Sequence, residues 1–136
     1  MTKEYTFYDY IDADGDGSNV IRSWLNSEAK AAKAYFGELI HNLEVSSPPG
    51  AANSFWKRPY AAPMKYEWDG FWEFRKKAKK IQYRLLGQMR YRDVYLVAYG
   101  THMGKYVTDI TPQTALIRVS QMIDNPIKYG RKHEHN

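Results

Sequence analysis

The sequence predicts an α+β fold. Two helical patterns occupy the first third of the 136-residue chain, strand-like runs joined by short links follow, and a further helix begins near residue 111. Helices and strands that are segregated along the chain in this way are typical of α+β domains. The length suits one domain, residues 1–136, and 43% hydrophobic residues are sufficient for its core.

The first predicted strand is Tyr5–Ile11, which is rich in aromatic and β-branched residues. An acidic turn follows, and its letters D-A-D-G-D-G match the opening of a calcium-binding EF-hand loop. An EF-hand requires a bidentate Glu at loop position 12, where this chain has Ser23, and a helix before the loop. We therefore expect the turn to start a helix, which is capped by Asp16, Ser18 or Asn19.

Two helices are expected next. Val20, Ile21, Trp24 and Leu25 recur at helical spacing and predict a short first helix. A second helix, capped by Asn26 or Ser27, has a continuous apolar face made of Ala32, Tyr35, Phe36, Leu39, Ile40 and Leu43. A loop is predicted over Ala51–Pro63, and its length suggests a functional or partly mobile connection.

Three strands are predicted in the middle of the chain, over Phe71–Arg75, Ile81–Met89 and Val94–Tyr99. The short links between them predict antiparallel pairing. Gly87 lies inside the second of these strands, which indicates a bulge or a close approach of two backbones.

The last helix is predicted to begin at Thr111-Pro112, because Thr is a good N-cap and Pro suits the first helical position. Its apolar stripe is Ala115, Leu116, Val119, Met122 and Ile123. Asn125-Pro126 stops the helix, and the polar residues 127–136 predict a frayed tail.

The composition excludes several classes of protein. There is no cysteine, which excludes disulfides and thiolate chemistry and favours the cytoplasm over secretion. The N-terminus lacks the apolar core of a signal peptide, and no run is long enough for a membrane span. The four histidines lack the spacing of a zinc site, so we expect no metal. The chain has no G-x-G-x-x-G motif and no P-loop, so we expect no cofactor.

Positive charge is concentrated in the middle third of the chain. Residues 57–92 hold eleven Lys/Arg and three Asp/Glu, whereas residues 1–56 hold four and eight. The cations are interleaved with aromatic residues, a pattern that suits a polyanion whose bases can stack. The alternative is a solvated basic face of the sheet. The predicted RNA-binding residues are Lys65, Lys76, Lys77, Lys79, Lys80, Arg90 and Arg92.

The candidate catalytic residues are Arg75, Arg84, His102, Lys105 and Tyr106. Glu73 and Arg75 share one face of a strand, and Arg84 lies on the next strand. If these strands pair, the cations can hold a scissile phosphate while His102 or Tyr106 transfers a proton from the 2′-hydroxyl of RNA. The alternative is a structural ion pair between Glu73 and Arg75, with Arg84 satisfying backbone carbonyls.

Several short motifs occur in a fixed order along nearly the whole chain. They are Asp12–Gly15, Trp24-Leu25, Gly70–Arg75, Tyr83–Leu86, the apolar run 94–99 and Thr111-Pro112 with Ala115 and Arg118. Their order and spacing resemble the phage-derived branch of the RelE/HigB-like toxins of type II toxin–antitoxin systems. The resemblance implies a RelE/ParE-like fold, in which two N-terminal helices pack on a twisted antiparallel sheet and a C-terminal helix follows.

The same resemblance implies an mRNA endonuclease (an mRNA interferase) that needs no metal and often cleaves mRNA in the ribosomal A site. Its partners would be the ribosome and a cognate antitoxin, usually a helix-turn-helix protein. Family members place two lysines after the last apolar strand, where this chain offers only His102 and Lys105. Relatives of the ParE type bind DNA gyrase and cleave no RNA, so a non-catalytic toxin or a degenerate nucleic-acid-binding member is the alternative.

Overall fold

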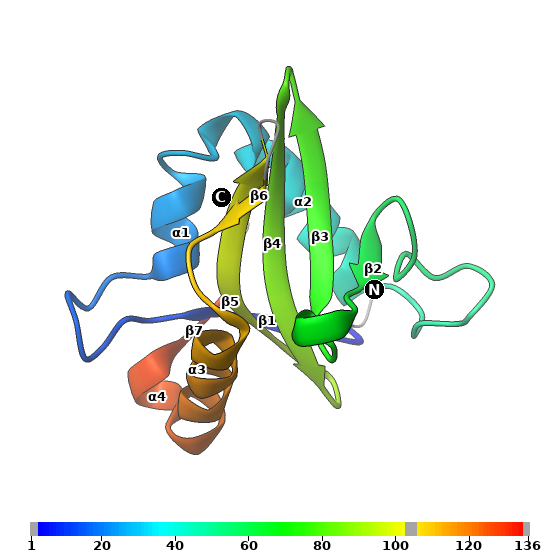
Figure 1. Cartoon of the computed structure of the whole chain (residues 1–136). Coiled ribbons are helices and arrows are strands. Elements are labelled where there is room, and N and C mark those ends of the chain that lie inside the picture. Colours follow the sequence, from blue (N-terminus) through cyan, green and yellow to red (C-terminus); the bar gives the residue numbers. More distant parts are fainter. Residues whose placement is uncertain (1–2, 103–105, 135–136) are drawn as a thin grey trace.

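The computed structural model describes residues 3–102 and 106–134, which form one sheet with helices packed on it (Figure 1). The sheet has seven strands in the order β2-β3-β4-β5-β1-β7, with β6 paired to β5. The strands are β1 (Thr6–Tyr10), β2 (Ala61–Pro63), β3 (Trp72–Ala78), β4 (Ile81–Arg90), β5 (Asp93–His102), β6 (Tyr106–Thr108) and β7 (Gly130–Lys132). The helices are α1 (Val20–Leu25), α2 (Lys33–Glu44), α3 (Pro112–Asp124) and α4 (Pro126–Tyr129), with 3-10 turns at η1 (Lys30–Ala32) and η2 (Tyr66–Trp68).

The sheet is mixed, so the predicted RelE/ParE-like arrangement with a wholly antiparallel sheet is wrong. β1 runs parallel to β5, with Phe7 opposite Val94, whereas β3, β4 and β5 form an antiparallel meander. β1 also joins the sheet ahead of both N-terminal helices. A parallel pair requires a long crossover, and the stretch between β1 and β5, which includes α1 and α2, supplies it.

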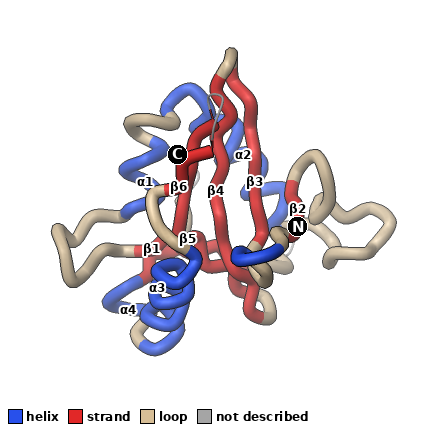
Figure 2. Tube along the Cα trace, viewed as in Figure 1, coloured by secondary structure: helices blue, strands red, loops and turns tan. Residues whose placement is uncertain are grey.

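Helices cover the two faces of the sheet unequally. α1 and α2 pack on one face, where Trp24 and Phe36 meet Phe74 and Leu85 in the larger core. α3 packs on the other face through Val119 and its buried neighbours. Figures 1 and 2 show α3 near one end of the strands, and the described part of the chain places no helix over this face near the β3–β4 turn.

Local signals explain where most helices begin. Asn19 caps α1, since its side chain accepts a hydrogen bond from the Arg22 N–H, and Thr111 caps α3 in the same way. These two caps confirm the sequence prediction. The predicted cap of α2 at Asn26 or Ser27 is wrong, because η1 intervenes and α2 begins without a side-chain cap.

A bulge in the β4–β5 ladder creates the docking point of α3. Leu86 is opposite Ala98 and Gly87 is opposite Leu96, so Val97 has no counterpart on β4. A Cβ on Gly87 would lie 3.0 Å from the Tyr95 carbonyl oxygen, which confirms the predicted close approach.

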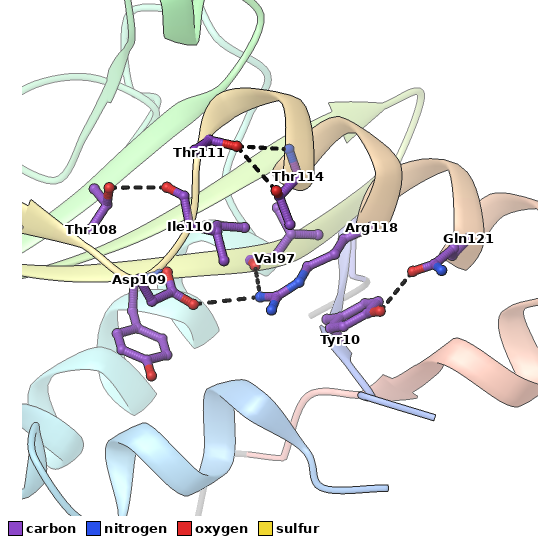
Figure 3. A network of polar contacts seen from close by, with 10 residues as sticks. Tyr10, Val97, Thr108, Asp109, Ile110, Thr111, Thr114, Arg118 and Gln121 are labelled. Carbon is purple, nitrogen blue, oxygen red and sulfur yellow. Dashed lines mark hydrogen bonds and ion pairs between the residues drawn. The ribbon is translucent and has the colours of Figure 1, made fainter. Parts of the chain in front are cut away.

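Arg118 on α3 then uses the carbonyl group that the bulge presents (Figure 3). Its Nη1 donates to the Val97 oxygen at 2.8 Å and lies 3.5 Å from Asp109 Oδ2. The guanidinium carbon is 4.7 Å from the centre of the Tyr10 ring, whose hydroxyl donates to Gln121 at 2.6 Å. Arg118, one of the motif residues, therefore fixes α3 to the sheet.

The predicted frayed tail is wrong for its described part. α4 and β7 are ordered elements, and β7 pairs antiparallel with β1. His133 is 4% exposed, and its Nδ1 lies 2.7 Å from Oδ1 of Asp9, which is completely buried. Asn19 Nδ2 donates to the other oxygen of Asp9 at 3.1 Å. The C-terminal segment is thus held by a buried polar cluster.

The acidic turn has a structural use. Asp14 accepts a hydrogen bond from the Tyr129 hydroxyl at 2.7 Å and pairs with Lys128 at 3.3 Å, and these contacts lower the pKa of Asp14. Asp16 accepts from the Ser18 N–H at 2.9 Å.

Across residues 3–102 and 106–134, no three His, Asp or Glu side chains are grouped so that they could hold a metal ion. Over the same ranges, no helix combines the length and apolar character that a membrane crossing requires.

Candidate functional site

The candidate site is centred on Glu73, which bridges two arginines of the α3 side of the sheet. Phe74 points into the core on the α2 side, so its neighbours Glu73 and Arg75 point to the opposite face. Arg75 and Arg84 are directly opposite each other on β3 and β4. Arg75 Nε lies 3.0 Å from one Glu73 oxygen, and Arg84 Nη2 forms an ion pair with the other.

Burial distinguishes the two arginines. Arg84 and Glu73 are each 8% exposed, whereas the side chain of Arg75 is 30% exposed. A buried charge must be paired, so the contact between Arg84 and Glu73 is part of the folded structure. The ion pair between Glu73 and Arg75 that the sequence allowed as an alternative is present. In that alternative Arg84 satisfies backbone carbonyls, whereas the structure pairs it with Glu73 as the more buried partner.

A basic pocket opens beside this ion pair. It has a volume of about 250 Å³ and is lined by Arg58, Lys65, Arg84 and Glu73 together with Ala62, Pro63 and Met64. We call it the basic pocket. Three cations face one carboxylate there, so the field in the pocket attracts anions. A phosphate group carries the charge and the acceptor oxygens that arginine side chains recognise best.

Arg58 contributes to this pocket although the sequence patterns do not single it out. It lies in the loop before β2, a three-residue strand that falls inside the stretch 51–63 predicted as a loop. β2 pairs with β3, with Ala62 opposite Glu73, and this pairing carries the loop to the site. The basic pair Lys57-Arg58 is the local signal, and it gives no indication of a partner strand.

His102 lies on the same face of the sheet as the arginines. Arg84 is opposite Gly100 on β5, and His102 is two residues further along, opposite Gln82. Residues two apart on a strand point to the same face and are about 7 Å apart. The sheet thus places His102 one strand away from Arg84 and slightly nearer the β3–β4 turn.

Two further candidate catalytic residues follow His102 along the chain. Lys105 lies outside the described residues. Tyr106 begins β6, where its backbone is opposite His102. Arg75, Arg84 and His102 are therefore the members of the predicted set that the described structure brings to one face.

The predicted RNA-binding residues do not form one surface. Lys65 lies at the basic pocket, and Lys79 and Lys80 form the β3–β4 turn. Arg90 and Arg92 lie at the opposite end of β4, about 30 Å away by strand geometry. Arg90 donates to Gln88 at 2.9 Å, and Arg92 donates to Glu4 at 3.0 Å.

Lys76 and Lys77 also separate, because adjacent side chains of a strand point to opposite faces. Lys77 has the same parity on β3 as Arg75 and shares its face. Lys76 points to the α2 side, where its Nζ lies 4.7 Å from the centre of the Tyr35 ring.

No protein-family model, curated protein or solved structure matches the chain. The geometry of the candidate site suits a phosphate held by Arg75 and the basic pocket, with the imidazole of His102 one strand away.

Proposed function

We propose that the chain is the toxin of a type II toxin–antitoxin pair and cleaves single-stranded mRNA. The RNA would lie on the face of the sheet that carries α3, near the β3–β4 turn, where no helix of the described chain covers this face. The observation that carries the proposal is the basic pocket, which shares this face with Arg75 and His102. Repeated phosphates need several cations in succession, and a proton-transfer group must lie near one of them.

Each residue would have a separate task in the reaction. Arg75 and two cations of the basic pocket, Arg58 and Lys65, hold the scissile phosphate and stabilise the charge that develops on its oxygens. His102 accepts the proton of the 2′-hydroxyl as the 2′-oxygen attacks phosphorus and the bond to the 5′-oxygen breaks. The departing 5′-oxygen takes a proton from water. Arg84 acts mainly by keeping Glu73 and Arg75 in place.

The proposed setting follows from the proposed substrate. mRNA and ribosomes place the protein in the cytoplasm, and a cognate antitoxin, most simply a helix-turn-helix protein, would control it. The buried pairing of Arg84 with Glu73 favours a second candidate, a non-catalytic toxin that binds gyrase or nucleic acid. Such a protein would need cations for binding and no imidazole.

Expression of variants in bacteria, with mapping of mRNA 5′ ends, tests the two candidates. The informative variant is the double substitution Arg75→Ala and His102→Ala. Lys132→Ala is the matched control, because Lys132 is an exposed cation on β7 at the far edge of the sheet. We expect growth arrest and new 5′ ends with the wild type and with the control, and neither with the double variant.

Other outcomes separate the alternatives. Cleavage that survives in the double variant contradicts the assigned residues. Growth arrest with DNA damage and without new 5′ ends supports the gyrase-binding candidate. A wild type that neither arrests growth nor binds RNA refutes the proposed function.

A further inference from the structure

A second pocket lies on the other side of the sheet, between α2 and the loop that leads to β2. It has a volume of about 270 Å³ and is lined by Tyr35, Phe55 and Tyr60 together with Glu38, Leu39 and Asn42. We call it the aromatic pocket. Its three aromatic side chains are half-buried, so each presents ring surface to the pocket while it rests on the main core.

The aromatic side chains are held in fixed orientations. Phe55 and Tyr60 make an edge-to-face contact with ring centroids 5.0 Å apart. Lys76 covers one side of Tyr35, whose pKa is raised by burial and by the nearby Tyr60 and Glu38. A flat apolar group entering the pocket would therefore meet ring surfaces that are already ordered.

Polar groups in the pocket offer a defined hydrogen-bonding pattern. Glu38 and Asn42 are four residues apart on α2, so they lie one turn apart on the same helix face. A glutamate carboxylate only accepts hydrogen bonds, whereas an asparagine amide both donates and accepts. Guanine is the base whose edge carries two adjacent N–H donors beside a carbonyl acceptor. Its donors match Glu38 and its carbonyl oxygen matches the Asn42 amide.

The charges around the pocket favour a polyanion. The pocket itself holds one carboxylate, Glu38, and two cations lie around it. Lys76 contacts Tyr35, and the exposed Lys57 lies on the loop between Phe55 and Tyr60. The net positive charge disfavours a cationic peptide, although the rings alone could bind it. β2 pairs with β3 only at residues 72–74, and residues 75–78 make no strand pairing on that side within the described chain. Lys76 and Lys77 point to opposite faces there, and a strand of RNA that crosses this edge can contact both.

We propose that the aromatic pocket binds one unstacked nucleobase of single-stranded RNA and prefers guanine. The inference rests on the proposed function, because the rest of the RNA lies on the face that carries the basic pocket. Base stacking on aromatic rings supplies affinity for any base, and the contacts of Glu38 and Asn42 supply the preference.

Two measurements on the full chain test this assignment. In the first, the oligonucleotides UUUGUUU and UUUUUUU, made with 2′-O-methyl riboses so that they cannot be cleaved, are titrated against wild type, Glu38→Gln and the control Glu28→Gln. The control changes an exposed carboxylate outside the aromatic pocket. We expect about a tenfold preference for the guanine-containing RNA in the wild type and the control, and its loss in Glu38→Gln, as for one bidentate base contact. In the second, NMR spectra are recorded with guanosine and uridine monophosphate. Guanosine monophosphate should shift signals of α2 and of residues 55–60.

The outcomes distinguish failure of the pocket from failure of the proposed function. RNA binding with no guanine preference and no effect of Glu38→Gln refutes the aromatic pocket and leaves the proposed function intact. Guanosine monophosphate binding at α2 in a protein without RNA affinity supports the pocket and refutes the proposed function. Tighter binding of a trimethyl-lysine peptide than of guanosine monophosphate overturns the assignment in favour of a cationic partner.

Discussion

Removal of Arg84 should destabilise the protein much more than removal of Arg75, although both arginines contact Glu73. Breaking a buried ion pair from one side costs about 3–5 kcal/mol, because the remaining charge stays buried. Glu73 retains Arg75 as a partner at 3.0 Å, so we reduce the expected cost of Arg84→Ala to about 2–4 kcal/mol. Arg75 is 30% exposed, and its loss should cost at most about 1 kcal/mol after solvent screening.

Urea unfolding followed by circular dichroism measures both costs. A slope of about 2 kcal/mol/M converts the predicted loss for Arg84→Ala into a midpoint shift of roughly 1–2 M. The corresponding shift for Arg75→Ala should be about 0.5 M or less. A double replacement by apolar residues, Arg84→Met with Glu73→Leu, should recover most of the stability, since it leaves no buried charge at either position.

The same pair of variants separates folding from RNA binding. Arg75→Ala should weaken RNA binding and reduce the salt dependence of binding by about one phosphate contact while the protein stays folded. If Arg84→Ala proves no less stable than Arg75→Ala, the buried ion pair does not stabilise the fold. Arg84 would then return to the set of direct phosphate ligands.

Three further predictions concern the rest of the framework. Arg118→Ala should lower the unfolding free energy by about 2–4 kcal/mol in urea titrations. The reason is that the Val97 carbonyl at the bulge and the ring of Tyr10 both lose their cationic partner. His133→Ala should cost about 1–3 kcal/mol in the same assay by leaving a buried oxygen of Asp9 without this partner, and it should speed amide exchange in β7. Burial raises the pKa of Asp109 above 3.8, so its contribution to stability is full below that pH and is lost as pH rises through the folded-state pKa. Asp109→Asn should therefore gain stability relative to wild type as the pH rises above about 3.8.

Short-range patterns account for the parts of the fold that are predictable from the sequence. The aromatic and β-branched run of β1, the apolar face of α2 and the Thr111-Pro112 start of α3 depend on neighbours a few residues away. The bulge at Gly87 is predictable because glycine is unfavourable inside a regular strand unless the ladder is irregular or a second backbone lies close to it.

Long-range pairing explains most of the errors. Three-residue strands such as β2 and β7 have too little pattern to predict, and they form because a neighbouring strand offers its edge. His133 and Asp9 are 124 residues apart, so no local signal marks either as buried. The predicted apolar stripe of α3 is too broad, because Leu116 and Ile123 are 47% and 42% exposed. This error also comes from long-range packing. The burial of these two residues depends on how far the sheet extends beneath the helix.

The candidate site shows how both kinds of information are needed. The alternation of side chains on β3 correctly places Arg75 with Glu73, but it cannot show that Arg58 arrives beside them through β2. Nor can the sequence separate Arg90 and Arg92 from Lys79 and Lys80, because the length of β4 matters only once its ends are fixed in space. Counting basic residues that are close in sequence therefore overestimates the area of continuous basic surface available to RNA.

Glu73 is the residue that best reconciles a structural role with a functional one. Its carboxylate lies among four cations and lowers the local positive charge. Taken alone, this effect opposes the binding of a phosphate. Glu73 also holds the guanidinium of Arg75 at a fixed distance and keeps Arg84 buried in a single orientation. A preorganised cation loses little freedom when a phosphate arrives, so the electrostatic loss is offset by a smaller ordering cost. Glu73→Gln should for this reason leave RNA affinity nearly unchanged or slightly higher, while cleavage, which depends on the position of Arg75 relative to His102, should fall.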